Sequence, residues 1–201
     1  NDERVVAAIE EFGWFARNDA HVSGGAGAVA STDFRDSPKG LFSSPAQCYM
    51  HRQASFVPAF FPEGIEFGED VDFFYFPAYE SKDLGNPVLG GGTLMSITNP
   101  SDATNELMEF FKLPLAHEVN GAQTGFLTPH KNVNPETYLN DALRGQAEIL
   151  VNATTFRFDG SDLMPGGVGA GTFWTGMVDY TGGKDAAAVA GEIQDSWDAL
   201  K

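Results

Sequence analysis

The fold is indicated most clearly by residues 169–200, which read GAGTFWTGMVDYTGGKDAAAVAGEIQDSWDAL. A helix is predicted to start near Thr172, because Phe173, Met177 and Tyr180 follow at spacings of four and three. The pair Gly182-Gly183 then interrupts the pattern. A last helix follows, with apolar residues along one side at Ala186, Val189, Ile193, Trp197 and Leu200. The stretch therefore predicts two amphipathic helices.

Three further helices are predicted nearer the N-terminus. Residues 3–18 form an amphipathic helix with an apolar stripe at Val5, Ile9, Phe12 and Ala16. Asn99 is the predicted N-cap of a second helix, since Pro100 suits the first helical position and Asp102 the first turn. Its inner face would hold Ala103, Leu107 and Phe110. A third helix is predicted over residues 141–153.

Short strands are predicted between these helices. Residues 71–77, VDFFYFP, are apolar at nearly every position and end at a proline, which is typical of a strand buried on both faces. Residues 47–53, QCYMHRQ, fit a strand that runs into a loop, and Leu94 to Ile97 fit another strand. Because helices and strands alternate, the predicted class is α/β.

Charge and composition exclude several kinds of partner. The chain has 201 residues, a formal net charge of −16 and an apolar content of 42%, so it is expected to fold and to be repelled by nucleic acid and anionic lipid. The single thiol, Cys48, cannot form an intrachain disulfide. No run of about 18 apolar residues occurs, and residues 1–4 lack the features of a signal peptide. We therefore expect a chain that is mature, truncated or never exported.

Two segments carry candidate ligand-binding residues in the first half of the chain. His51, Arg52 and Gln53 present three hydrogen-bonding side chains at the end of a predicted strand, where a guanidinium and a carboxamide can hold vicinal sugar hydroxyls. A surface ion-pair cluster is the competing interpretation. Gly90 to Thr93 let the backbone approach a ligand closely. A phosphate loop is excluded there because no Gly-Lys-Ser/Thr ending follows, but a plain turn fits equally well.

Two more candidates lie near the C-terminus. Asp159 and Asp162 are expected to shape a loop through Asx turns or to accept hydrogen bonds from sugar hydroxyls. Paired catalytic carboxylates normally come from separate elements, which argues against glycosidase chemistry here. Trp174 lies beside the core stripe of its helix, so its indole can offer a flat apolar face to a pyranose ring. A core tryptophan is the alternative.

Nothing in the sequence indicates a catalytic centre, a metal site or a cofactor. The four histidines, at positions 21, 51, 117 and 130, show no metal-ligand spacing, and Cys48 has no evident base partner. No serine lies in a Gly-x-Ser-x-Gly elbow. We therefore expect a protein that is not an enzyme.

Four segments together resemble the extracellular solute-binding proteins of carbohydrate ABC importers, and most of all the alpha-glucoside-binding type. They are CYMHRQASF at 48–56, PVLGGG at 87–92, TFRFDGSDLMP at 155–165 and VGAGTFW at 168–174. Members of that family are roughly twice as long as this chain, which resembles their C-terminal half. The expected fold is therefore part of a two-lobed (type II) periplasmic binding protein with the ligand cleft between its lobes.

The resemblance also implies how the chain is divided and what it does. Residues 1–76 and 134–201 would belong to the C-terminal lobe, and residues 77–133 would return to the N-terminal lobe. The sugar-contacting positions implied are His51 to Gln53, Gly91 to Thr93, Asp159, Asp162 and Trp174. The full-length protein would be a monomer that binds an alpha-glucoside in the periplasm, or outside the cell at the membrane, and delivers it to an ABC permease. A glycoside hydrolase and a non-transport carbohydrate-binding module are the alternatives.

Overall fold

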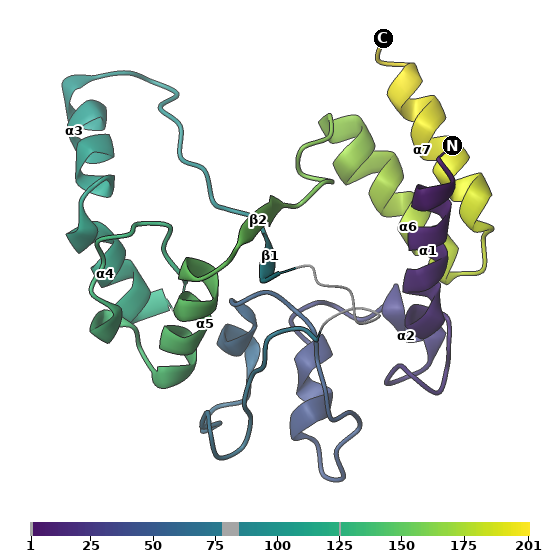
Figure 1. The fold of residues 1–201 in the computed structure, drawn as a ribbon, viewed down its shortest axis with the longest axis horizontal. Coiled ribbons are helices and arrows are strands. Elements are labelled where there is room, and N and C mark those ends of the chain that lie inside the picture. The colour runs from purple at the N-terminus through teal and green to yellow at the C-terminus, as the bar shows by residue number, and fades with distance from the viewer. Residues whose placement is uncertain (1, 78–84, 125) are drawn as a thin grey trace. The chain divides into compact units, whose positions relative to one another are not determined.

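The computed structural model describes residues 2–77, 85–124 and 126–201, and the chain divides into two compact units (Figure 1). Unit 1 consists of Asn1–His51 and Phe158–Lys201. Unit 2 consists of Arg52–Arg157. Unit 1 is thus built from the two ends of the chain, and unit 2 from its middle.

Unit 1 is built around three helices that lie side by side in Figure 1: α1 (Glu3–Ala16), α6 (Trp174–Thr181) and α7 (Ala186–Asp198). It also contains α2 (Ala26–Val29), the 3₁₀ turn η1 (Ser37–Phe42) and the π-helical segment η4 (Gly167–Phe173), which continues directly into α6. The amphipathic helices predicted over residues 3–18 and after residue 182 are confirmed. The helix expected to start near Thr172 begins earlier, as π-helix.

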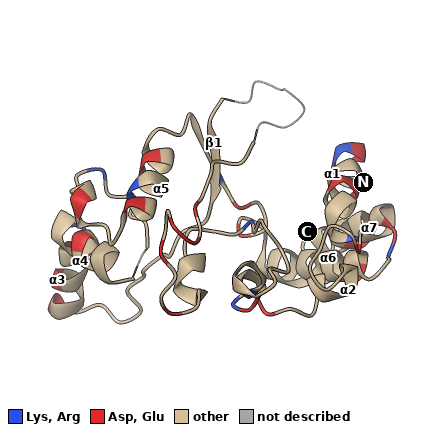
Figure 2. Ribbon diagram, turned by 90° about the horizontal axis from the view of Figure 1, so that it is seen from below, with Lys and Arg blue, Asp and Glu red and all other residues tan. Residues whose placement is uncertain are grey.

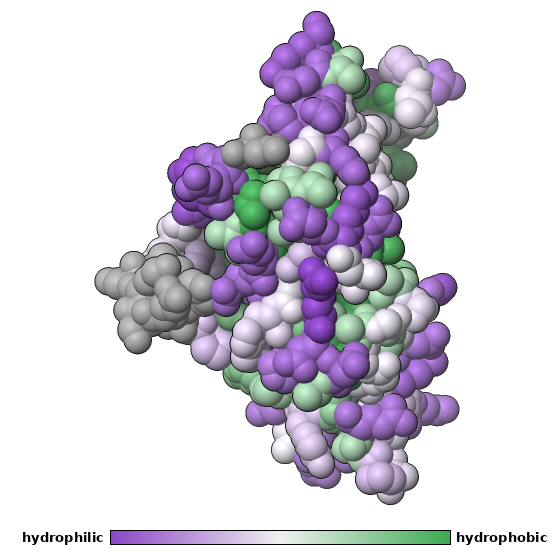
Figure 3. Space-filling model, turned by 90° about the vertical axis from the view of Figure 1, so that its right-hand side faces the viewer, coloured by the Kyte–Doolittle hydropathy of each residue, from purple (hydrophilic) through white to green (hydrophobic). Residues whose placement is uncertain are grey.

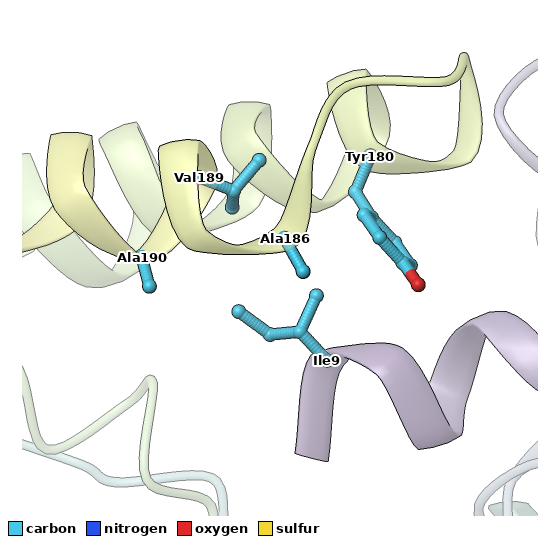
Figure 4. Packing of buried hydrophobic residues seen from close by; sticks show 5 residues of the cluster. All are labelled: Ile9, Tyr180, Ala186, Val189 and Ala190. Atoms are coloured by element: carbon cyan, nitrogen blue, oxygen red, sulfur yellow. The ribbon is translucent and has the colours of Figure 1, made fainter. Parts of the chain in front are cut away.

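The core of unit 1 forms where these helices meet (Figure 4). Ile9 on α1 faces Tyr180 on α6 and three small residues of the α7 surface, Ala186, Val189 and Ala190. Met177, Phe12, Val6 and Ile193 pack around this cluster. The stripes read from the sequence therefore lie on the faces that become buried, apart from Val5 on α1, Trp197 on α7 and Leu200 just after α7, which remain exposed.

Unit 2 has a smaller core. Its elements are η2 (Val57–Phe60), β1 (Pro87–Gly90), α3 (Asp102–Phe111), α4 (Pro114–Thr124), η3 (Pro135–Thr137), α5 (Asp141–Val151) and β2 (Thr155–Phe158). The last residue of β2, Phe158, is the first residue of the second stretch of unit 1. β1 and β2 pair in a two-stranded sheet. Tyr138, Leu143 and Ala147 form the buried cluster, with Leu127 packed against it. The helix predicted over residues 141–153 is confirmed as α5.

Several predicted strands are wrong. Residues 71–77 form only an isolated bridge between Val71 and Phe67, and Phe74 and Phe76 are exposed. Residues 47–53 and residues 94–97 are irregular. A strand needs a neighbour to satisfy its backbone groups, and among the described residues only β1 and β2 supply one to each other. The expected α/β class is thus confirmed in part: among the described residues the chain has several helices and one two-stranded sheet.

The start of α3 also differs from expectation. The N-cap is Ser101, whose hydroxyl accepts a hydrogen bond from the Thr104 backbone N–H, while the Thr104 hydroxyl oxygen accepts one from the Ser101 N–H. This reciprocal capping box satisfies two backbone donors, which a cap at Asn99 would not do. No residue of α3 is buried, so the predicted inner face lies uncovered.

The surface is rich in acidic and hydrophilic side chains, as the composition predicts. Acidic residues lie on helices of both units (Figure 2), in keeping with 28 Asp and Glu against 12 Lys and Arg. Hydrophilic side chains predominate on the face shown in Figure 3, with apolar patches between them. Among the described residues, no helix combines the length and the apolar character that a membrane crossing requires.

Candidate functional site

The predicted ligand-binding residues are divided between the two units. His51, Asp159, Asp162 and Trp174 belong to unit 1. The unit 2 residues are Arg52, Gln53, Gly91, Gly92 and Thr93. The boundary between the units therefore runs through the predicted His51 to Gln53 cluster.

The loop after β2 is shaped by Asp159. One carboxylate oxygen, Oδ1, accepts a hydrogen bond from the Ser161 backbone N–H at 2.9 Å and another from the Ser161 hydroxyl at 2.7 Å. This is the Asx-turn arrangement that was one of the two interpretations of the sequence. Asp162, in the same loop, is exposed. The two carboxylates therefore have different environments although they are only three positions apart.

The same loop packs against the π-helical segment. The Pro165 carbonyl oxygen accepts hydrogen bonds from Val168 N at 2.8 Å and from Gly169 N at 2.9 Å. Gly169 is buried against the loop backbone, and a Cβ there would overlap the Ser161 carbonyl oxygen. Glycine is therefore required at this position by close approach of two backbone segments. π-helical turns are rare and occur frequently at functional sites.

Trp174 follows this segment as the first residue of α6. Phe173 and Met177, next to it on the helix, turn toward α1 and are partly buried, whereas 68% of Trp174 is exposed. The indole is thus the large apolar group that the helix leaves in solvent at this point. Its exposure rules out, within unit 1, the core role that was the alternative for this residue.

The segment before His51 is held by main-chain contacts. The Gly40 carbonyl oxygen accepts hydrogen bonds from Gln47 N at 3.0 Å and from Cys48 N at 3.4 Å. Cys48 is partly buried, and this burial raises the pKa of its thiol. His51 and Gln53 are half-buried and Arg52 is exposed. A loop anchored on η1 therefore carries this cluster, in place of the predicted strand end.

The glycine segment begins at the last residue of β1. Gly90 lies against the Phe156 ring of β2, where a Cβ would approach ring carbons to 2.9 Å. Gly91, Gly92 and Thr93 are exposed and irregular, and a Cβ on Gly92 would meet nothing within 4 Å. Packing against Phe156 therefore accounts for glycine at position 90, whereas no contact within the described residues requires glycine at position 92.

Two features escaped sequence reasoning. An apolar groove of about 490 Å³ runs between α1 and α6, lined mainly by Val5, Ile9, Phe12, Phe173 and Met177. The Thr172 hydroxyl oxygen, in the π-helical segment, is buried without a hydrogen-bond partner. The apolar residues that line the groove belong to the stripes predicted for α1 and α6. The sequence did not show how these two helices would be aligned against each other. No group of three potential metal-ligating side chains occurs in the described part of the chain.

Comparison with known proteins supplies the wider context. Over all 201 residues the chain is 67% identical to the alpha-glucosides-binding periplasmic protein AglE of Rhizobium meliloti, of which it covers 44%. The chain is therefore similar, over its whole length, to part of an alpha-glucoside-binding protein. It is also 41% identical over 197 residues to the osmoprotective compounds-binding protein GgtB of Synechocystis sp., of which it covers 46%. No family model and no solved structure matches the chain.

The relationship to AglE and GgtB confirms the resemblance that the four sequence segments indicated. It extends over the whole chain for AglE, so all four segments lie within the aligned region. The chain spans less than half the length of these two relatives. Both are named as binding proteins, in agreement with the lack of catalytic motifs.

Proposed function

We propose that the full-length protein containing this chain binds an alpha-glucoside, or a similar small sugar, and delivers it to the permease of an ABC importer. The observation that carries this proposal is the 67% identity to AglE over all 201 residues. We further propose that the protein is periplasmic, or extracellular at the membrane, that it is monomeric and that it catalyses no reaction.

The sugar site that we propose combines one apolar surface with several polar groups. Trp174 would stack its exposed indole on the C–H face of a pyranose ring. His51, Arg52 and Gln53 would hydrogen-bond vicinal hydroxyls. Gly91, Gly92 and Thr93 would contribute backbone groups, and Asp162 would accept a hydrogen bond from a sugar hydroxyl. This mixture is typical of pockets in which a few polar groups orient a ligand.

These residues would come together through two lobes. We propose that residues 1–76 and 134–201 belong to one lobe and residues 77–133 to the other, with hinge closure burying the sugar between them. The identity to AglE supports this arrangement. The exposure of Trp174, Arg52 and Gly91 to Thr93 also supports it, because a cleft residue must be open to solvent before ligand binds.

Calorimetric titration of the full-length protein with maltose, sucrose and trehalose tests the proposal. We expect saturable binding of at least one disaccharide, unchanged by EDTA, with the sugar recovered intact in a reducing-sugar assay. Cleavage of a disaccharide would instead indicate a glycoside hydrolase. Loss of binding in EDTA would indicate a metal requirement and would also contradict the proposal.

A further inference from the structure

The contacts of Asp159 give this residue a role different from that of a sugar ligand. Its Oδ1 atom accepts both Ser161 hydrogen bonds, at 2.9 Å from the backbone nitrogen and 2.7 Å from the hydroxyl. Both bonds lie within the loop, and the residue itself is half-buried. The carboxylate therefore fixes the backbone at Ser161.

Ser161 in turn contacts the π-helical segment. Its carbonyl oxygen lies against the Cα of Gly169, so closely that no side chain fits between them. The Pro165 carbonyl oxygen accepts the Val168 and Gly169 N–H groups at 2.8 and 2.9 Å, which are hydrogen bonds of the first helical turn of this segment. The loop backbone at Ser161 thus contacts Gly169, and Gly169 lies within the π-helical residues 167–173 that precede Trp174.

The register of this segment decides where the indole points. An α-helix has 3.6 residues per turn, so a shift of one residue rotates every following side chain by about 100° relative to the preceding chain. A π-helical turn accommodates such an extra residue. If the segment closed into regular α-helix while the loop stayed in place, Trp174 would turn away from its present face.

We propose that Asp159 is a positioning residue, which acts through Ser161 and Gly169 to hold the π-helical register and thereby aims Trp174 at the sugar. The proposal rests on the sugar-binding function and on the stacking role of Trp174. In this proposal, Asp159 acts on Ser161, Ser161 on Gly169, and Gly169 on the orientation of Trp174. Asp162 is then the carboxylate of the loop that is open to ligand.

A double-mutant cycle in the full-length protein tests this. Asp159→Ala is made alone and together with Trp174→Ala, and the dissociation constant of the tightest-binding sugar among maltose, sucrose and trehalose is measured. Loss of the two hydrogen bonds should weaken binding about tenfold in the parent. In the Trp174→Ala background the same change should have less than a twofold effect, because the group it positions is gone.

Two conservative variants separate positioning from loss of fold. Asp159→Asn keeps an acceptor oxygen for Ser161, so it should bind within about twofold of the parent. Ser161→Ala removes only the hydroxyl bond and should weaken binding about threefold. Asp162→Ala is the matched control, since it lies in the same loop without these contacts. Its effect should be the same in both Trp174 backgrounds.

The outcomes distinguish this inference from the proposed function. Equal weakening by Asp159→Ala in both backgrounds would show a direct sugar contact and overturn the positioning role. Weakening by Asp159→Asn as strong as that by Asp159→Ala, or no effect of Asp159→Ala in the parent, would also overturn it. If no sugar binds the parent protein at all, the proposed function fails instead.

Discussion

Units 1 and 2 differ in how much of their apolar surface they bury. In unit 1, helices α1, α6 and α7 and the π-helical segment cover one another, and Val168 and Val189 are completely buried. In unit 2 the buried cluster is small, and many large apolar side chains are exposed, among them Phe74, Phe76, Leu94, Leu107 and Leu115. Unit 1 therefore has the larger buried core, although it too exposes large apolar side chains such as Trp14, Tyr49 and Trp174.

The strongest test compares the isolated 201-residue chain with the full-length protein. The isolated chain should bind sugar at least about a hundredfold more weakly, because the proposed two-lobed cleft would also need residues outside these 201. Side-by-side calorimetry and urea unfolding measure this. If the isolated chain is monomeric, unfolds cooperatively and binds sugar as tightly as the full-length protein, the difference in burial between units 1 and 2 has no consequence for binding.

The next test concerns the site on unit 1. Trp174→Ala should weaken sugar binding by the full-length protein about thirtyfold, or about 2 kcal/mol, because it removes the stacking surface. Trp14, which is 69% exposed on α1 against the His21 ring, is a matched control. Trp14→Ala should leave the affinity unchanged. A Trp174→Ala protein within about twofold of the parent would contradict the stacking role.

A pair of core substitutions tests the difference in burial directly. Val189→Ala, at a fully buried position of α7, should lower the free energy of unfolding by about 2 kcal/mol in both the isolated chain and the full-length protein. Leu115→Ala, on α4 at a position 56% exposed, should cost less than about 0.5 kcal/mol in the isolated chain. In the full-length protein it should cost about 2 kcal/mol if the helix is covered.

Urea unfolding of the four variant proteins measures these differences. The difference between units 1 and 2 is supported if Leu115→Ala destabilises the full-length protein more than the isolated chain while Val189→Ala destabilises both equally. A small effect of Leu115→Ala in both proteins would mean that α4 is a genuine solvent-facing helix, and the exposed apolar residues of unit 2 would then need another explanation.

The smallest expected effect is on the Cys48 thiol, near the boundary between the units. Burial raises its pKa, so a smaller fraction is thiolate at pH 8 than in an exposed cysteine, and the thiolate is the reactive form. Alkylation by iodoacetamide should be a few-fold slower than for a model peptide thiol, and unfolding in urea should abolish the difference. Equal rates in the folded protein would show that the segment before His51 is not packed on η1.

The helices were predictable from the sequence because their signal is local. The stripe through Ile9 and Ala16, and the one through Ala186 and Val189, are periodic in the sequence and become buried in the structure. The strand predicted at residues 71–77 failed because an apolar run says nothing about whether a pairing partner is present. The helix α4 was missed because its sequence, PLAHEVNGAQT, has only a weak apolar face.

The site was predictable in its parts but not in its geometry. Trp174 and the loop carboxylates were identifiable from side-chain chemistry. The π-helical segment was not, because it depends on the approach of Gly169 to Ser161, a tertiary contact that leaves no periodic pattern. The cap at Ser101 was missed because Asn99 offered the same side-chain chemistry two residues earlier, and only the backbone geometry decides between them.

The contact between Gly13 and Tyr180 has a consequence for the history of the sequence. The Tyr180 hydroxyl occupies the space where a Cβ on Gly13 would lie, and the guanidinium carbon of Arg17 lies 4.7 Å from the centre of the Tyr180 ring. A side chain at position 13 would therefore require either the Tyr180 side chain or α1 to shift. Positions 13 and 180 should therefore have changed together during divergence, with a larger residue at 13 appearing only in lineages that carry a smaller one at 180.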